Sequence, residues 1–154
     1  MKALTLTQPW ASLVALGHKQ IETRSWRTHY RGPLAIHAAQ GFPPFAREFA
    51  AEEYAIGRLT ERPPHRSPPR LPRGALVAIV VLDDVRPTEE VALETTGLER
   101  RLGDFTSGRW AWLFDPTKRF VLDEPIFCKG ALGLWTIPDG ELVRLGAATG
   151  EAAS

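Results

Sequence analysis

The sequence contains little that would place it among disulfide-bonded, secreted or membrane proteins. Cys128 is the single cysteine in 154 residues, so no internal disulfide bond is possible, which suits a reducing compartment. The longest apolar run, residues 75–82, is far shorter than the roughly 18 residues that a membrane-spanning helix needs. Residues 1–6 are too few and too polar for a secretion signal. We therefore expect a cytoplasmic protein with no membrane partner.

Motifs for metal binding, phosphate binding and nucleophilic catalysis are also missing. The four histidines and Cys128 do not recur at the spacing of a zinc site. The chain has neither the Gly-x-Ser-x-Gly turn of serine hydrolases nor the glycine-rich loop that cradles phosphates. Cys128 is better explained as a small buried hydrophobic residue than as a nucleophile. We expect no bound metal and no cofactor.

The net charge is small, but the charges are unevenly distributed. The formal sum is +1, yet residues 1–40 hold five Lys and Arg residues against Glu22 alone. Residues 57–74 hold five arginines against Glu61, whereas residues 75–108 hold seven acids against three arginines. Two basic segments brought together by folding would bind a polyanion such as RNA; the alternative is a solvated surface without a partner.

Length and patterning indicate one α+β domain. With 44% hydrophobic and 24% charged residues, the chain has the composition of a globular protein. We expect the domain to cover residues 1–145, and the small, polar residues 146–154 to form a frayed tail. Six or seven short strands and two or three helices predict a small, partly closed mixed β-barrel whose helices flank a cleft. The expected strands are residues 4–6, 20–26, 34–37, 75–82, 110–114, 119–122 and 132–136, and the expected helices are residues 8–17, 42–57 and 88–102.

A basic, proline-rich segment interrupts this domain at residues 57–74. Five prolines between Glu61 and Arg73 forbid a helix there, so we expect an extended loop. Arg66, Arg70 and Arg73 would either grip a nucleic-acid backbone or only make the insertion more soluble.

The densest polar cluster lies at residues 17–26. Lys19 falls between an expected helix and an expected strand, and the alternation of that strand places Glu22, Arg24 and Trp26 on one face. An acid, a base and an aromatic ring on one face can bind a heteroaromatic ligand by hydrogen bonding and stacking. The alternative is an exposed strand face with an ion pair.

Three further residues are candidates for the same ligand. Trp110 and Trp112 share one strand face and form either a stacking platform for bases or part of the barrel core. His37 ends a strand near the expected cleft, although many histidines in such places only satisfy local hydrogen bonds.

The stretch from Leu4 to Trp26, LTLTQPWASLVALGHKQIETRSW, resembles the opening of the ASCH domain family in the PUA-like superfamily. The family signature is a glycine, one residue, a lysine, two residues, an acid or threonine, one residue and an arginine. Further resemblance lies in RGPLAIHA, GRWAW and KGALGLW, so that it spans roughly residues 3–137. The signature is matched by Gly17, Lys19, Glu22 and Arg24, with Pro9 and Trp10 before it and Trp110 and Trp112 after it.

The resemblance implies a β-barrel with a cleft lined by the signature residues, and a role in RNA binding, coactivation or RNA modification. Some small ASCH proteins are amidohydrolases that remove the acetyl group from N4-acetylcytidine, with a lysine, a threonine and a glutamate as the proposed catalytic residues. Lys19 matches the lysine, but Glu22 stands at the position of the threonine, and we assign no counterpart to the glutamate.

Two hypotheses follow. In the first, the cleft is a binding module for RNA or a nucleotide, in which Lys19, Glu22, Arg24 and neighbouring residues hold the ligand. In the second, Lys19 activates water against the amide of an acylated nucleoside, and Glu22 orients the lysine or relays the proton. The missing threonine favours the first hypothesis.

Overall fold

The computed structural model describes residues 1–52 and 71–150, and in them a single mixed sheet carries the fold. The sheet has six strands in the order β2-β5-β4-β3-β1-β6; β1 and β3 run parallel and the other neighbours antiparallel. The strands are β1 Lys2–Leu6, β2 Ile21–Arg24, β3 Gly32–Ala38, β4 Ala75–Pro87, β5 Trp110–Phe127 and β6 Leu134–Thr136. The helices are α1 Trp10–Ala15, α2 Pro44–Glu52, α4 Thr88–Ala92, α5 Gly97–Arg101 and α6 Asp139–Thr149. The predicted α+β class is confirmed.

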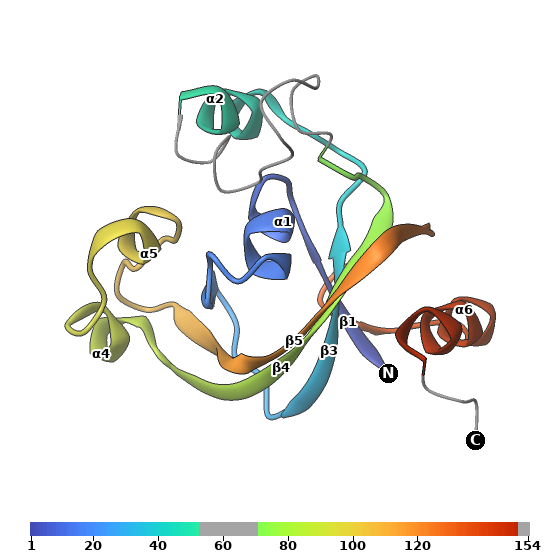
Figure 1. Cartoon of the computed structure of the whole chain (residues 1–154). Coiled ribbons are helices and arrows are strands. Elements are labelled where there is room, and N and C mark those ends of the chain that lie inside the picture. The colour runs from blue at the N-terminus through green and yellow to red at the C-terminus, as the bar shows by residue number, and fades with distance from the viewer. Residues whose placement is uncertain (53–70, 151–154) are drawn as a thin grey trace.

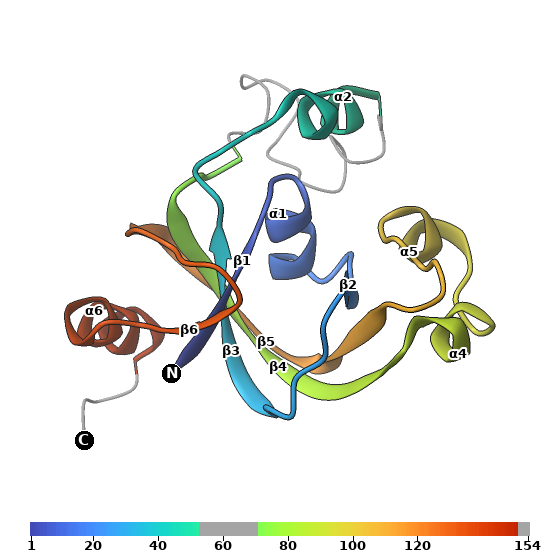
Figure 2. The same cartoon turned by 180° about the vertical axis from the view of Figure 1, so that it is seen from behind.

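The sheet curls into a half-barrel because its two longest strands bend. The pairing of β4 with β5 shifts register between Leu76 and Ala78, and again on both sides of Leu82. Such irregularities bend a strand and increase its local twist. The curled sheet therefore wraps around α1, with α4 and α5 near the edge formed by β2 and β5 (Figures 1 and 2).

The inner face of the sheet and α1 share the larger hydrophobic core. Trp112 from β5 is fully buried there, and Val14 of α1 is 1% exposed. Because strand side chains alternate, Leu4 and Leu6 of β1 face this core. The same core also contains Leu34, Ile36, Val80, Leu82 and Phe114.

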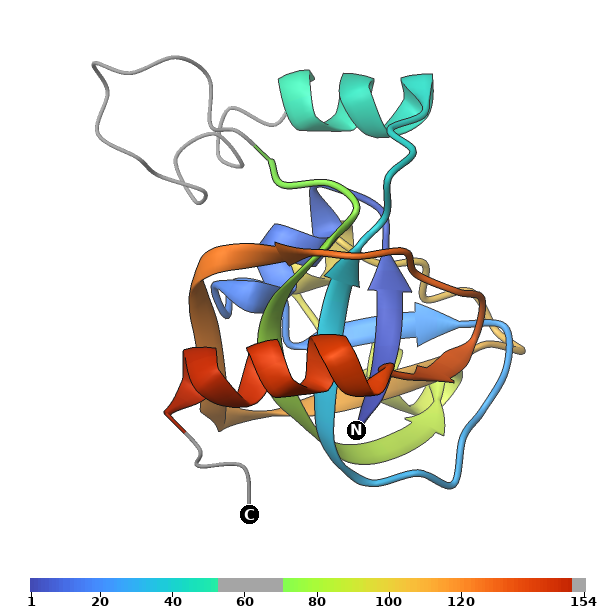
Figure 3. The ribbon, with the colours of Figure 1, turned by 90° about the vertical axis from the view of Figure 1, so that its right-hand side faces the viewer.

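The outer face of the sheet is covered by α6 (Figure 3). Leu145 of this helix is 1% exposed and packs in a second core with Leu76, Leu122 and Trp135. Residues 146–149, expected to belong to an irregular tail, form the last turn of this helix, which Gly150 closes with φ of 72°. The amphipathic packing of α6 explains the difference.

Two predicted element boundaries are corrected. The expected strands 110–114 and 119–122 are parts of one long strand, β5, because β4 supplies pairing partners along its length. The expected helix 88–102 is two short helices, since Gly97 has φ of 62°, which a continuing right-handed helix does not allow. No helix in the described ranges is long and apolar enough to cross a membrane.

Candidate functional site

A cavity opens between α1, β2 and the loop that precedes β5. Its volume is about 580 Å³, which is enough for a nucleotide. We call it the β2 pocket, because β2 and the residues directly after it supply the centre of its wall. The pocket is lined by Thr5, Leu6, Thr7, Trp10, Glu22, Thr23, Arg24, Ser25, Trp26, Phe45, Arg101, Leu102, Gly103, Asp104 and Arg109.

Arg24 is held on one side and unpaired on the other. One of its terminal nitrogens, Nη2, donates to the carbonyl oxygen of Thr5 at 2.8 Å. Its Nε is buried and makes no hydrogen bond to any described residue. A buried N–H group without a partner costs free energy, so a ligand oxygen that accepts from it would be bound favourably.

Lys19 lies beneath the pocket wall. Its side chain is 1% exposed, and the residue is not among those of the described chain that line the pocket. The ammonium donates to the carbonyl oxygen of Ile21 and lies 4.0 Å from the Glu22 carboxylate. Lys19 follows the turn at Gly17, and its side chain points into the protein interior. Glu22 and Arg24 line the pocket, and Lys19 contacts the Glu22 carboxylate from the buried side.

Aromatic rings form a further part of the pocket lining. The ring of Trp10 stacks on Phe49 at 5.0 Å, and Trp26 packs edge-on against Trp112 at 4.8 Å. Both pocket-lining tryptophans are therefore fixed by a second ring. Phe45, 63% exposed, stands at the rim of the pocket. This surface can stack on a planar heterocycle.

Three other predicted ligand-binding residues lie outside the pocket lining. Trp112 is fully buried, and its indole N–H donates to the carbonyl oxygen of Trp26 at 3.3 Å. Trp110 is half-buried, with the guanidinium of Arg27 4.9 Å from its ring centre. Pro9, also buried, precedes α1. Neither Pro9 nor these two tryptophans are among the described residues that line the pocket.

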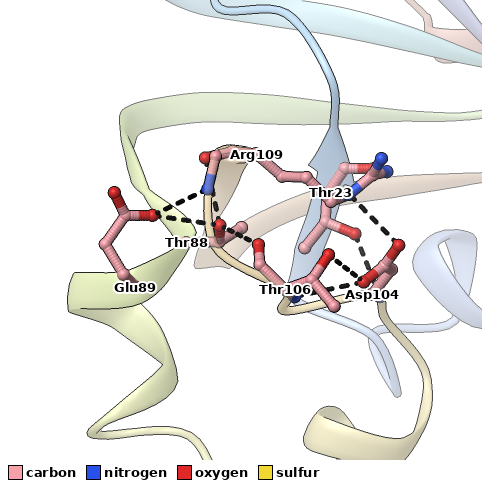
Figure 4. A network of polar contacts seen from close by, with 7 residues as sticks. Thr23, Thr88, Glu89, Asp104, Thr106 and Arg109 are labelled. Atoms are coloured by element: carbon pink, nitrogen blue, oxygen red, sulfur yellow. Dashed lines mark hydrogen bonds and ion pairs between the residues drawn. The ribbon is translucent and has the colours of Figure 1, made fainter.

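The loop of residues 102–109 completes the pocket, although the sequence patterns predicted none of its residues at the site (Figure 4). Asp104 donates its backbone N–H to Thr23 Oγ1 at 3.1 Å, and Arg109 donates from Nη2 to the Thr23 carbonyl at 3.1 Å. The buried Thr88 hydroxyl donates to the carbonyl oxygens of Thr106 at 2.7 Å and Arg109 at 3.1 Å. The loop is thereby attached to both β2 and the start of α4.

Asp104 remains charged in this loop. The hydroxyl and backbone N–H of Thr106 donate to its carboxylate at 2.7 and 3.1 Å, and these bonds, with the Arg109 charge, lower the pKa of Asp104. The same carboxylate lies 3.5 Å from Arg109 Nε. An Asp-x-Thr spacing before an arginine is the sequence signal that would have suggested this arrangement.

His37 lies in a different place. It is 2% exposed and borders a second cavity of about 500 Å³. Its ring nitrogens contact Thr5 Oγ1 at 3.2 Å and the Cys128 carbonyl oxygen at 2.9 Å. Burial lowers the pKa of His37, as expected for an imidazole taken out of water. The structure therefore does not bring His37 into the β2 pocket.

The predicted backbone-contacting arginines are described only in part. Arg73 is exposed, with its guanidinium 5.8 Å from the ring centre of Phe42. Arg66 and Arg70 lie outside the described residues. In the described ranges, no group of three or more His, Cys, Asp or Glu residues could hold a metal ion.

Comparison with known proteins defines the class to which this fold and pocket belong. The model of the ASCH domain matches residues 4–106, and the chain therefore belongs to the ASCH domain family. The predicted resemblance is thus confirmed.

Individual relatives cover parts of the chain or share its fold. Activating signal cointegrator 1 of Mus musculus is 42% identical over 81 residues, and that of Homo sapiens is 41% identical over the same length. These alignments cover 53% of this chain but only 14% of each relative. The crystal structure of ASCH from Zymomonas mobilis has the same fold, with a TM-score of 0.55 at 13% identity, covering 95% of this chain and 93% of that one. A point mutant of the Zymomonas mobilis protein matches with a TM-score of 0.54 at 14% identity, covering 95% of this chain and 96% of the mutant.

Proposed function

We propose that this ASCH domain binds RNA or a nucleotide in the β2 pocket. The observation that carries the proposal is the combination, in one cavity, of the incompletely bonded guanidinium of Arg24 with the two fixed rings of Trp10 and Trp26. Stacking of a base on an aromatic side chain contributes roughly 1–3 kcal/mol and is available to every base. Glu22, in the same wall, can accept hydrogen bonds from an exocyclic amino group.

Contacts outside the pocket would extend the interface along an RNA chain. Arg73 is exposed and can bind phosphate, and we propose the same role for Arg66 and Arg70 of the basic, proline-rich segment. Membership of a family with a PUA-like fold, which is often found in RNA-related proteins, supports this assignment. We propose that the interaction takes place in the cytoplasm, because a single cysteine suits a reducing compartment.

The geometry favours binding over hydrolysis. A lysine that activates water must reach the substrate, but Lys19 is 1% exposed and its ammonium contacts Ile21 and Glu22. The second candidate function is an amidohydrolase that acts on N4-acetylcytidine. It is supported by the contact between Lys19 and Glu22, the two residues that the hydrolase hypothesis makes catalytic. Incubation with acylated nucleosides, followed by chromatography, separates the two: the binding function predicts no turnover.

The direct test is a titration of the wild type and of Phe45→Ala with short single-stranded RNA and with mononucleotides, followed by tryptophan fluorescence. Phe45 is 63% exposed at the pocket rim, so its removal should not unfold the domain but should weaken binding several-fold. Val143→Ala, which truncates a 62% exposed residue of α6 on the far face, is the matched control and should bind as the wild type does. Equal affinities of all three proteins would place the ligand elsewhere.

A further inference from the structure

Arg24 and Arg109 both contribute a guanidinium group to the lining of the β2 pocket. Arg24 is the last residue of β2, and the pairing of β2 with β5 places it opposite Trp110. Arg109 immediately precedes Trp110. The two arginines are therefore close to each other along the paired strands β2 and β5. Both residues line the pocket.

The hydrogen-bonding capacity of both arginines is incompletely used. Each donates from Nη2 to a backbone carbonyl, Arg24 to Thr5 and Arg109 to Thr23. The Nε atom of each is buried without a hydrogen bond to a described residue. Arg109 has Asp104 at 3.5 Å, but Arg24 forms no ion pair within the described ranges. An anionic group in the pocket would provide the missing acceptors, and a phosphate matches the planar guanidinium well.

Arg109 is held in place before any ligand arrives. Asp104 lies beside its Nε, and Thr106 in turn holds the Asp104 carboxylate through two hydrogen bonds. The shared contacts with Thr23 attach both residues to β2 (Figure 4). An arginine fixed in this way loses little side-chain entropy when it binds a ligand. Arg109 also lies beyond residues 4–106, the part of the chain that the family model matches.

We infer that the β2 pocket takes a nucleotide together with its phosphate, and not a bare nucleoside, with Arg24 and Arg109 donating to the phosphate oxygens. This inference rests on the proposed function, because it takes the aromatic wall of Trp10 and Trp26 as the site of the base. Asp104 and Thr23 act as positioning residues for Arg109. The phosphate can belong to a free mononucleotide or to an RNA chain, which present the same chemistry to the two arginines.

The test is calorimetric titration of the wild type with cytidine, cytidine 5′-monophosphate, inorganic phosphate, and a short oligoribonucleotide with or without a 5′-phosphate. The monophosphate should bind at least about tenfold more tightly than the nucleoside, a difference that about 1.4 kcal/mol produces. Arg24→Gln and Arg109→Gln should each reduce this ratio towards one. Arg144→Gln, which removes an exposed guanidinium from α6, should keep the ratio of the wild type.

The outcomes separate the inference from the function on which it rests. Equal wild-type affinities for nucleoside and monophosphate would overturn the inference and leave the proposed function standing, whether or not the variants fold. If no nucleoside, nucleotide or oligonucleotide binds, both the inference and the proposed function are wrong. Tighter binding of the phosphorylated oligonucleotide than of the free monophosphate would support the inference. It would also identify an RNA chain as the source of the bound phosphate.

Discussion

Lys19 and Arg24 are both cations of the family signature, but their surroundings give them different roles. Arg24 lines the β2 pocket with donors to spare, whereas Lys19 is buried and contacts the carboxylate of Glu22 from beneath. The attraction between the lysine and the acid holds the Glu22 side chain in the pocket wall, where it is available as an acceptor. We therefore propose that Arg24 and Glu22 contact the ligand and that Lys19 acts through Glu22.

Lys19→Met tests this division. The substitution keeps the length of the buried side chain and removes its charge, so we expect the domain to fold, which circular dichroism would check. Ligand affinity should fall, but in a Glu22→Gln background the same substitution should have almost no further effect, because the acid transmits it. Losses that simply add in a double-mutant cycle would show that Lys19 touches the ligand itself. Loss of turnover on an acylated cytidine would instead identify an enzyme.

The loop of residues 102–109, which lines part of the pocket, is held by two other elements of the fold. The fully buried hydroxyl of Thr88, at the start of α4, donates to two carbonyl oxygens of this loop. Thr23 of β2 holds the same loop through Asp104 and Arg109. One wall of the β2 pocket is thus positioned by two elements that lie far apart in the sequence, an arrangement that the sequence alone did not suggest.

Thr88→Val should loosen this wall. Valine is close to threonine in shape, but it leaves the Thr106 carbonyl oxygen without the 2.7 Å bond that it accepts, so we expect a loss of about 1–3 kcal/mol in the free energy of unfolding. The control is Thr117→Val, which removes an exposed hydroxyl that bonds Asp115 and should cost less than about 0.5 kcal/mol. Urea denaturation measures both values. Equal losses would contradict the assigned role of Thr88.

At the scale of the whole molecule, the fold was more predictable than the site. Strand and helix periodicities indicated the α+β class. The stretch from Leu4 to Trp26, together with the later segments GRWAW and KGALGLW, indicated the family. Each of these signals depends on residues close together in the chain. The pairing of β2 with β5 was not visible, because contacts between distant segments depend on tertiary packing. For that reason Arg109 was not among the predicted site residues, although it lies in the segment GRWAW, and His37 was expected at a cleft that it does not border.

The measurement that tests the central claim most directly is a nuclear magnetic resonance titration of the five tryptophan indole N–H groups with a nucleoside monophosphate. Trp10 and Trp26 line the β2 pocket, whereas Trp135 lies in the core beneath α6, with its indole N–H donated to Thr5 Oγ1. Binding in the β2 pocket predicts saturable shifts of the Trp10 and Trp26 signals that exceed any shift of the Trp135 signal. Saturable binding that moves Trp135 and leaves Trp10 and Trp26 in place would contradict it.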